Sequence, residues 1–538
     1  MTEADSGSNG DNGQVTNPAE NPSDSGNGGG ANTNPTESKA TYTITFDANG
    51  GSGEMKAQTA ESGSEITLAA NAFTRDGWTF SGWATSAGVG VSYSDKAKIT
   101  LTGDITLYAT WGMTAASAVT AIADLTEEGT HTVTVAGEIS SDDMTELANA
   151  ISGLAENVKI ILDLGDTTGL TDIPAEFDLE NLAGIVIPAS VTKLSCLFWN
   201  NYNLSVLKVA ENNPAYKSVG NIIYTKDGQT LVLAAKNLTE VTIPSGVKTI
   251  GSWAFRQNFN LKKVSFEEGI VLETIEDNAF DSCGILTEIS LPSTLESIGD
   301  FTFGNTKLSV VKYNGTKSGW DNINKGNNNN DLDNAAVICM GSDPKEVYAP
   351  ADKAATVIAG LEGGTRENPN VYMIKITDKT LTAEQLKEIG TTIETVANKS
   401  NYYAFFSLDL SSATEVTKIP EEAFSTCRLR GLILPDSLET IGIGAFGYNR
   451  FEEIVIPDNV KTIEDGGFEY CSKLKTITLP ASLVSIGASA FAGTVLETVY
   501  YKGPQAQWEI LKTNISTTDN DKLTGAKIIC SDGIINGE

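Results

Sequence analysis

A repeat of about two dozen residues constrains the fold of this chain more than any other feature. Its clearest marker is phenylalanine, which recurs 22 to 25 residues apart in two series: Phe255, Phe280 and Phe303, then Phe424, Phe446, Phe468 and Phe491. A unit of this length cannot bury its own apolar residues. The copies must therefore stack into a solenoid, with neighbouring strands about 4.8 Å apart.

The unit from Leu474 to Phe491 predicts how one coil folds. The alternation of Ile477-Thr-Leu479 predicts a short strand, and Pro480 is expected to end it because proline donates no hydrogen bond to a ladder. Gly487 is expected to permit the bend that returns the chain, as are Gly299 and Gly442 in other units. Leucine, isoleucine and phenylalanine are expected to point inward.

A longer period lies over the first. Amphipathic helices with capping-box signatures are predicted from Ser140 to Leu154 and from Thr382 to Val396. Each leads to a strand, at 160–164 and 406–410. The two blocks also end alike, with a tryptophan (Trp320 or Trp508) ahead of a short strand at 337–339 or 528–530.

We therefore expect two tandem solenoids, over residues 113–343 and 344–538. Each would be closed by a leading helix and a trailing helix–strand piece, because end coils would otherwise expose apolar faces and strand edges. The join is expected between Gly341 and Ala351. An extra hairpin is predicted between Leu197 and Ala235, where the coil pattern is interrupted.

The N-terminal part divides in two. Residues 1–39 consist mainly of small polar residues, glycine and proline, and predict a flexible tether. Residues 40–112 predict a small β domain with alternating strands and a tight turn at 49–51. Trp78, Phe80, Trp83 and Trp111 are expected to form its core, and the alternative is an exposed platform for stacking sugars.

Charge and hydropathy narrow the classes of partner. The formal net charge is -32, from 37 basic and 69 acidic residues, which disfavours nucleic acid as a partner. No run of eighteen apolar residues is present to span a membrane. The first residues, Met1 to Asn32, lack the basic and apolar regions of a signal peptide. If the protein is exported, we expect its leader to precede this sequence.

The residues that carry most enzyme chemistry are scarce. His131 is the only histidine, which removes the common triads and histidine-based metal sites. Cys283, Cys427 and Cys471 share one position in the coil and are expected to be buried free thiols, because stacked coils hold them beyond disulfide reach. We predict no catalytic residues and no cofactor, and hence no enzyme.

Acidic side chains are plentiful without forming a convincing site. Glu421-Glu422 and Glu452-Glu453 are neighbours, and neighbours on a strand face opposite ways, so neither pair is expected to act on one bond. The run 327–334 offers oxygen ligands but lacks the pattern of a calcium loop, and it predicts a mobile loop. We predict no metal site.

The outer face of the strands is the predicted ligand surface. Residues between the inward positions should form ladders on this face, and open faces suit macromolecules better than small substrates. The candidate ligand-facing residues are Arg430, Ile433, Val455, Thr478 and Tyr500 in the second solenoid and Lys263 and Ser265 in the first.

Two families resemble parts of the chain. The sequences Leu291-Pro292, Leu295-Glu-Ser-Ile-Gly299 and Ala279-Phe-Asp-Ser-Cys283 resemble the BspA-like, or Treponema-type, leucine-rich repeat, and the resemblance covers much of residues 160–530. Phe46-Asp-Ala-Asn-Gly-Gly51 and Gly77-Trp-Thr-Phe-Ser-Gly-Trp83 resemble the Listeria-Bacteroides repeat, also called the internalin B-repeat. The second resemblance implies a β-grasp-like fold for residues 40–112.

The expected architecture is thus mainly β, with two tandem leucine-rich-repeat solenoids and capping helices behind a small β-grasp-like domain. Both resemblances imply secretion, usually to a bacterial surface, and no catalysis. The implied function is a cell-surface adhesin or protein-binding module for host matrix or surface proteins or for other bacterial cells. The alternative is a structural or carbohydrate-binding surface-layer protein. Membrane association is expected only through a lipid anchor on a residue outside this sequence, as in a lipoprotein.

Overall fold

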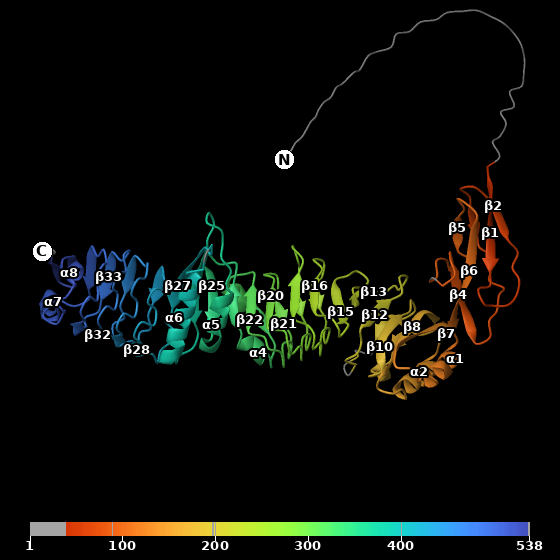
Figure 1. Cartoon of the computed structure of the whole chain (residues 1–538), viewed down its shortest axis with the longest axis horizontal. Helices are drawn as coiled ribbons and strands as arrows, with labels where there is room; N and C mark the ends of the chain where they lie inside the picture. The colour runs from red at the N-terminus through yellow and green to blue at the C-terminus, as the bar shows by residue number, and fades with distance from the viewer. Residues whose placement is uncertain (1–38, 89, 196–197, 199–200, 400, 536–538) are drawn as a thin grey trace, which may run out of the picture.

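The computed structural model describes residues 39–88, 90–195, 198, 201–399 and 401–535. These residues form an elongated rod of stacked strands, with a small β domain standing at its N-terminal end (Figure 1). Except for Lys39, the predicted tether 1–39 lies outside the described residues, as does Cys196.

The small β domain packs around Trp83. Its strands are β1 (Thr41–Asp47), β2 (Gln58–Glu61), β3 (Glu65–Thr67), β4 (Trp78–Ala84), β5 (Lys98–Thr100) and β6 (Ile105–Met113). Strand β1 pairs parallel with β6 and antiparallel with β2. The Trp83 ring lies 4.7 Å from the Phe46 ring and 4.9 Å from the Phe80 ring, centroid to centroid, and Trp83 is 0% exposed. The predicted core role of Trp83 is confirmed.

The first block continues the sheet of the small domain, because Met113 on β6 pairs with Val135 on β7. Its elements are α1 (Ala115–Ala123), β7 (Gly129–Glu138), α2 (Ser141–Ser152), β8 (Val158–Thr168), β9 (Asp172–Ile173), the short 3-10 helix η1 (Ala175–Phe177), β10 (Leu182–Ile187), β11 (Lys193–Leu194) and β12 (Val206–Val209). The predicted capping box of α2 is present, between Ser140 and Asp143. Sequence reasoning missed α1 and β7.

The predicted hairpin is also confirmed. Strand β14 (Ile222–Thr225) pairs antiparallel with both of its neighbours, β13 (Tyr216–Val219) and β15 (Thr230–Ala234). Strand β14 separates two hydrophobic cores of the rod. Ile223 belongs to the core formed by the elements that precede the hairpin, whereas Ile222 and Tyr224 belong to the core of the coils that follow it.

Beyond the hairpin, each coil contributes one longer strand and one two-residue strand. In the first solenoid these are β16 (Glu240–Ile243), β17 (Thr249–Ile250), β18 (Lys263–Phe266), β19 (Thr274–Ile275), β20 (Glu288–Leu291), β21 (Ser297–Ile298), β22 (Val310–Tyr313) and β23 (Asn324–Lys325). In the second they are β28 (Lys418–Ile419), β29 (Gly431–Ile433), β30 (Thr440–Ile441), β31 (Glu453–Val455), β32 (Thr462–Ile463), β33 (Thr476–Leu479), β34 (Ser485–Ile486) and β35 (Thr498–Tyr501). The two-residue strands pair in parallel from coil to coil, and so do most of the longer strands, except between β18 and β20 and between β29 and β31.

The phenylalanines line up in interior columns, as predicted. In the second solenoid the ring centroids of Phe424, Phe446, Phe468 and Phe491 are successively 5.8, 5.5 and 5.5 Å apart, and all four side chains are 0% exposed. The first solenoid has a corresponding column of Phe255, Phe280 and Phe303. Successive coils therefore stack in register.

The expected role of the coil glycines is wrong. Gly299, Gly442 and Gly487 do not have left-handed φ values. A Cβ at Gly487 would instead lie 2.5 Å from the backbone nitrogen of Asp465 in the preceding coil, so these glycines allow close approach between coils. The bend uses left-handed residues two positions before and after each phenylalanine, such as Gly466 and Tyr470.

Each solenoid ends in the predicted helix–strand piece. These pieces comprise α3 (Lys317–Asn322), α4 (Asn330–Asp333) and β24 (Ala336–Cys339), and α7 (Gln505–Lys512), α8 (Asp521–Thr524), β36 (Lys527–Cys530) and β37 (Gly533–Ile535). The loop predicted at 327–334 is wrong over α4. Asn329 is fully buried before this helix, and its side-chain amide donates to the Gly299 carbonyl at 2.8 Å, which satisfies a coil backbone.

The second solenoid begins with a β-α-β-α-β unit. Its elements are β25 (Lys345–Ala349), α5 (Ala351–Gly360), β26 (Asn370–Ile376), α6 (Ala383–Ala397) and β27 (Ala404–Asp409). The predicted capping box of α6 joins Thr382 and Gln385. Sequence reasoning missed α5 and β26, which repeat the plan of α1 and β7.

The first solenoid is not closed at its end, contrary to expectation. Strand β24 pairs antiparallel with β25, and one sheet runs through the junction in the order β20-β22-β24-β25-β26-β27-β29. The end strand β24 has apolar residues on both faces, so each face can belong to a different core. Val337 and Cys339 belong to the core of the first solenoid, whereas Ala336 and Ile338 belong to that of the second.

Candidate binding surface

The predicted apolar row of the second solenoid is present on its outer sheet face. Val455, Thr478 and Tyr500 are register partners on adjacent strands. Ile433 lies on the preceding strand and lines the same shallow hollow, of about 650 Å³. Ile433, Val455 and Tyr500 are 46%, 58% and 45% exposed.

The row continues beyond the predicted residues. Tyr500 pairs with Ile529 on β36, which pairs with Ile534 on the last strand, and Ile534 is 53% exposed. We call Ile433, Val455, Thr478, Tyr500, Ile529 and Ile534 the apolar row. Sequence reasoning missed its last two members because they lie outside the repeat, although Ile528-Ile529-Cys530 was recognised as a strand and offers an apolar residue to each face.

Arg430 does not belong to this ladder at the predicted position. Strand β29 begins at Gly431, which pairs with Ser407 on β27. In the next coil, Glu453 occupies the ladder position two residues before Val455. The corresponding position, two residues before Ile433, is occupied by Gly431 and not by Arg430. Arg430 lies one residue earlier, in the turn, with its guanidinium carbon 3.1 Å from the centroid of the Phe405 ring.

The outer face of the first solenoid is polar. Lys263 and Ser265 lie on β18 opposite Glu240 and Thr242 on β16, as predicted, and Lys263 is exposed. The Ser265 and Thr242 hydroxyls are 3.0 Å apart. This face thus offers hydrogen-bonding groups where the other offers an apolar row.

The two outer faces lie on opposite sides of the continuous sheet at the junction. Opposed residues of an antiparallel pair share a face, so Val337 in the core of the first solenoid shares a face with Tyr348. Tyr348 in turn pairs with Lys375 on β26, on the outer face of the second solenoid. The core therefore changes sides at β24–β25.

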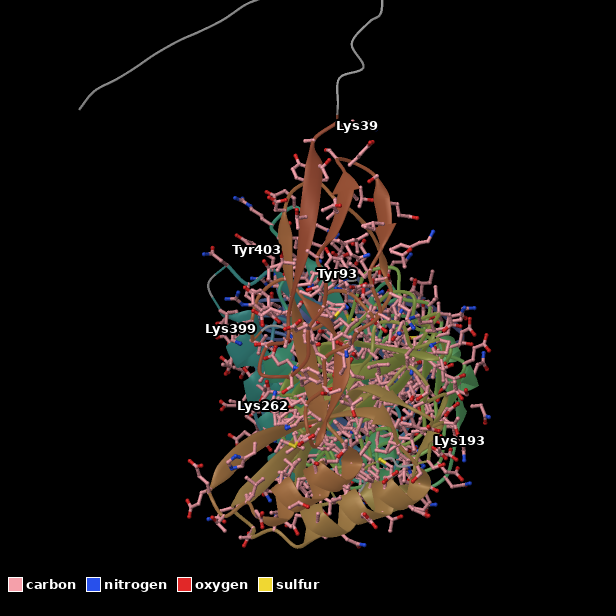
Figure 2. All side chains as sticks on the ribbon, turned by 90° about the vertical axis from the view of Figure 1, so that its right-hand side faces the viewer. Lys39, Tyr93, Lys193, Lys262, Lys399 and Tyr403 are labelled. Atoms are coloured by element: carbon pink, nitrogen blue, oxygen red, sulfur yellow. The ribbon has the colours of Figure 1, made fainter. Side chains whose placement is uncertain are left out.

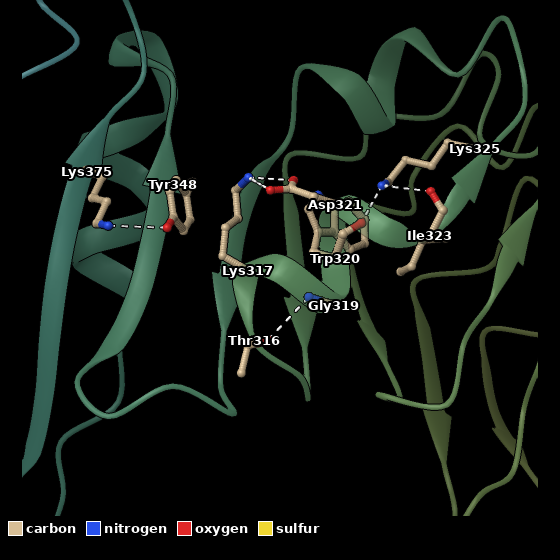
Figure 3. A network of polar contacts seen from close by, with 9 residues as sticks. All are labelled: Thr316, Lys317, Gly319, Trp320, Asp321, Ile323, Lys325, Tyr348 and Lys375. Carbon is tan, nitrogen blue, oxygen red and sulfur yellow. Dashed lines mark hydrogen bonds and ion pairs between the residues drawn. The ribbon is translucent and has the colours of Figure 1, made fainter.

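Polar contacts cover this crossing point (Figure 3). The Lys375 ammonium lies 3.3 Å from the Tyr348 hydroxyl and 2.8 Å from a Glu346 carboxylate oxygen. The ammonium of Lys317, at the start of α3, also lies over the Tyr348 ring, 4.7 Å from its centroid. It forms an ion pair with Asp321 at 2.5 Å. The two lysines cover an aromatic side chain at the margin of the first solenoid's core.

The thiols are placed as predicted. Cys283, Cys427 and Cys471 are fully buried and free, and each sulfur lies 3.2 Å from a backbone carbonyl oxygen of a neighbouring element. Burial raises the pKa of each of these thiols to about 12. They are therefore poor nucleophiles in the folded state.

The other titratable candidates show no assembled chemistry. The ring nitrogen of His131 lies 2.8 Å from the Glu127 carbonyl oxygen at an exposed position. Among the described residues, no group of three or more histidine, cysteine, aspartate and glutamate side chains could hold a metal ion.

One expectation about the carboxylates is corrected. Glu452 precedes β31 while Glu453 lies on it, so the strand alternation does not separate them. Both line one hollow of about 740 Å³ on the flank of the coils, together with arginine and lysine side chains.

No helix in the described part of the chain is both long and apolar enough to cross a membrane.

Comparisons with known proteins agree with the repeat and with the N-terminal domain. Residues 232–326 and 391–509 match the family described as BspA type Leucine rich repeat region, in six copies. Residues 42–110 match the Listeria-Bacteroides repeat domain. No curated protein is significantly similar to the chain.

Solved structures of bacterial leucine-rich repeat proteins are similar to parts of the chain. One from Eubacterium ventriosum is 22% identical and has a TM-score of 0.27, covering 68% of this chain and 76% of its own. One from Bacteroides ovatus is 19% identical with a TM-score of 0.22, covering 70% and 84%. The described register and the family matches together identify the chain as a protein with BspA-type leucine-rich repeats behind an N-terminal Listeria-Bacteroides repeat domain.

Proposed function

We propose that this protein is a bacterial cell-surface adhesin whose apolar row binds a protein partner, such as a host matrix or surface protein or a protein of another bacterial cell. The observation that carries the proposal is the alignment of exposed apolar side chains over adjacent strands in an otherwise strongly acidic chain. Contiguous exposed apolar surface is typical of sites for macromolecular partners.

The shape of the face supports a macromolecule over a small substrate. The hollow along the row is shallow and open, and Asp436, Asp458 and Lys502 line it around the apolar residues. An apolar centre with a polar rim is the usual arrangement of a protein interface. BspA-type repeat proteins are generally found at the cell surface or secreted. In this proposal a lipid on a residue outside this sequence attaches the protein to the membrane.

The test is binding to purified host matrix glycoproteins, measured by biolayer interferometry. Replacing Ile433 and Val455 together by threonine should weaken binding at least about tenfold, since a buried apolar contact contributes 1 kcal/mol or more. Thr478 already occupies this ladder position, so the fold should tolerate the change.

The matched control replaces Ile443 and Val484 by threonine. These two side chains are 44% and 57% exposed and lie outside the apolar row. Equal affinities of the row variant and the native protein would contradict the proposal, as would the absence of binding to every glycoprotein tested.

The alternative of a carbohydrate-binding protein is not supported at Trp78 and Trp83, two residues of the predicted sugar-stacking platform. Trp83 is fully buried, and the guanidinium of Arg75 covers the Trp78 ring at 4.0 Å.

A further inference from the structure

The flank of the second solenoid concentrates positive charge in an acidic protein. Two hollows, of about 740 and 260 Å³, share Arg450. Between them they are lined by six cations and two carboxylates, whereas the whole chain has 37 basic and 69 acidic residues. We call this surface the basic flank; its cations are Lys399, Arg428, Arg430, Arg450, Lys473 and Lys475, and its carboxylates are Glu452 and Glu453.

Part of this charge forms a column along the stack. Arg428, Arg450 and Lys473 each lie four residues before the central inward residue of a strand, so successive coils place like charges at the same position. Like charges held at neighbouring positions repel each other. The equivalent residues of the first solenoid are Asn260, Ile285 and Lys307, so the coil itself does not require the column.

The cations of the basic flank form no ion pairs with carboxylates in the described part of the chain. Among the described residues, none of the six lies within 4.0 Å of a carboxylate oxygen. Elsewhere in the same coils, Lys418 pairs with Glu464 at 2.7 Å and Lys461 with Glu439 at 3.0 Å. Burial and repulsion by Arg450 lower the pKa of Arg430, while the charge of Glu452 acts in the opposite direction and only partly offsets them.

Aromatic rings border the same cations. Tyr402, Tyr403 and Phe405 line the smaller hollow with Arg428 and Arg450. In Figure 2, which views the rod from its N-terminal end, Tyr403 and Lys399 lie on the same flank, opposite Lys193. The smaller hollow therefore combines ring faces with guanidinium groups.

A second aromatic pair lies on the turns that carry the column. The rings of Tyr448 and Tyr470 stack 4.9 Å apart and are 48% and 51% exposed. Both have left-handed φ values, 61° and 52°, where a bulky residue is unfavourable. The next coil has Gly493 at this position, so neither burial nor the bend explains the two tyrosines.

We propose that the basic flank binds an anionic polysaccharide, whose sugar rings stack on the aromatic side chains while sulfate or carboxylate groups pair with the arginines and lysines. Guanidinium groups bind such oxyanions through two parallel hydrogen bonds. The row of cations, one per coil, matches a chain ligand that runs along the stack. The basic flank adjoins the hollow of the apolar row, and Arg430 and Glu453 line both. Arg450 and Lys473, which carry the test, do not line the hollow of the apolar row, so the proposal does not depend on the proposed function.

The chemistry favours a polysaccharide over the other polyanions. The acidic remainder of the chain repels the dense charge of a nucleic acid. An acidic peptide would use the cations but would leave the stacked tyrosines without a role. Both are therefore outcomes of the test.

The test measures binding of the full chain to dextran sulfate and to polygalacturonate by calorimetry, with uncharged dextran as the reference. We expect one or both anionic polymers to bind, more weakly as salt rises, and uncharged dextran not to bind. Replacing Arg450 and Lys473 together by glutamine should weaken this binding at least about tenfold. Replacing Lys418 and Lys461 by glutamine removes the same charge from another surface and should change it less than about twofold.

The tyrosines separate a polysaccharide from other anions. Replacing Tyr448 and Tyr470 by glycine suits the left-handed backbone, so the variant should fold, and it should bind the polymer at least about threefold more weakly. An unchanged affinity in this variant would overturn the proposal. Equal losses of affinity in the Arg450/Lys473 variant and in the Lys418/Lys461 variant would also overturn it. The same holds if neither polymer binds, or if polyglutamate or a DNA duplex binds equally tightly.

Discussion

At the scale of single residues, Lys236 shows how the rod buries a charge between its coils. The side chain is 2% exposed, and its ammonium donates to the Arg256 carbonyl at 2.5 Å. Burial lowers the pKa of Lys236 to about 8. Between pH 8 and 10.5 the unfolded chain therefore holds a proton that the folded protein has lost, so this lysine makes stability rise with pH across that window.

We predict that Lys236→Met removes this pH dependence. The difference in unfolding free energy between the variant and the native protein should shift by roughly 3 kcal/mol between pH 7 and pH 10.5, in favour of the native protein as pH rises. Urea denaturation at several pH values would measure it. The buried thiols act in the opposite sense above pH 9, because their raised pKa is lost on unfolding. Cys427 and Cys471 contribute equally to both proteins, whereas the pKa of Cys283, which the Lys236 charge lowers, is itself changed by the substitution. A difference independent of pH would contradict the assigned burial.

Gly390 lies at a position where the fold leaves no room for a side chain. It lies in α6, where a Cβ would approach the Ala423 carbonyl oxygen to 1.7 Å. Gly390→Ala should therefore destabilise the protein by about 1 to 3 kcal/mol through overpacking, although alanine is the better helix former.

Gly360, at the end of α5, is the matched control. A Cβ there would meet no atom within 4 Å. Gly360→Ala should be neutral or stabilise by up to about 1 kcal/mol, as thermal unfolding would show. A stability loss of the same size in both variants would count against the close contact at α6.

At the scale of elements, the interior column of rings couples one coil to the next. Phe468 stacks on Phe446 and Phe491, each 5.5 Å away, and also meets the edge of Phe451 at 6.2 Å. Phe468→Ala should cost about 3 to 5 kcal/mol, because it leaves a cavity closed on both sides. The midpoint of chemical denaturation is the measurement, and an unchanged midpoint would contradict this packing.

At the scale of the whole molecule, the continuous sheet makes the two solenoids share residues at their junction. Ile338 lies on the last strand of the first solenoid, yet it is 4% exposed in the core of the second and pairs with Val347. The outer faces of the two solenoids are therefore opposite faces of this sheet at the junction.

We predict that Ile338→Asp acts mainly on the second solenoid. A buried unpaired carboxylate costs several kcal/mol, so backbone amides of α5 and α6 should lose protection from hydrogen exchange. The Phe255–Phe303 column packs on the other face and should keep its protection. Loss of protection confined to the first solenoid would contradict the change of core side at β24–β25.

The repeat alone determined much of this protein. Leucine, isoleucine and phenylalanine recur at fixed places with a period of 22 to 25 residues, and stacking the copies is the arrangement that buries them all. The stacked coils, the phenylalanine columns and the outward row from Ile433 to Tyr500 therefore follow from the sequence. The capping boxes at Ser140 and Thr382 are equally local signals.

Only the tertiary structure decided what depends on contacts between distant segments. Gly487 reads in sequence as a bend, but the neighbouring coil at Asp465 sets its role. The antiparallel step at β24–β25 exchanges the buried and exposed faces, and the sequence of a strand that is apolar on both faces, such as Ala336–Cys339, does not say which face each core will take. The basic flank likewise exists only because stacking superimposes residues some 22 positions apart, so that isolated charges become a column.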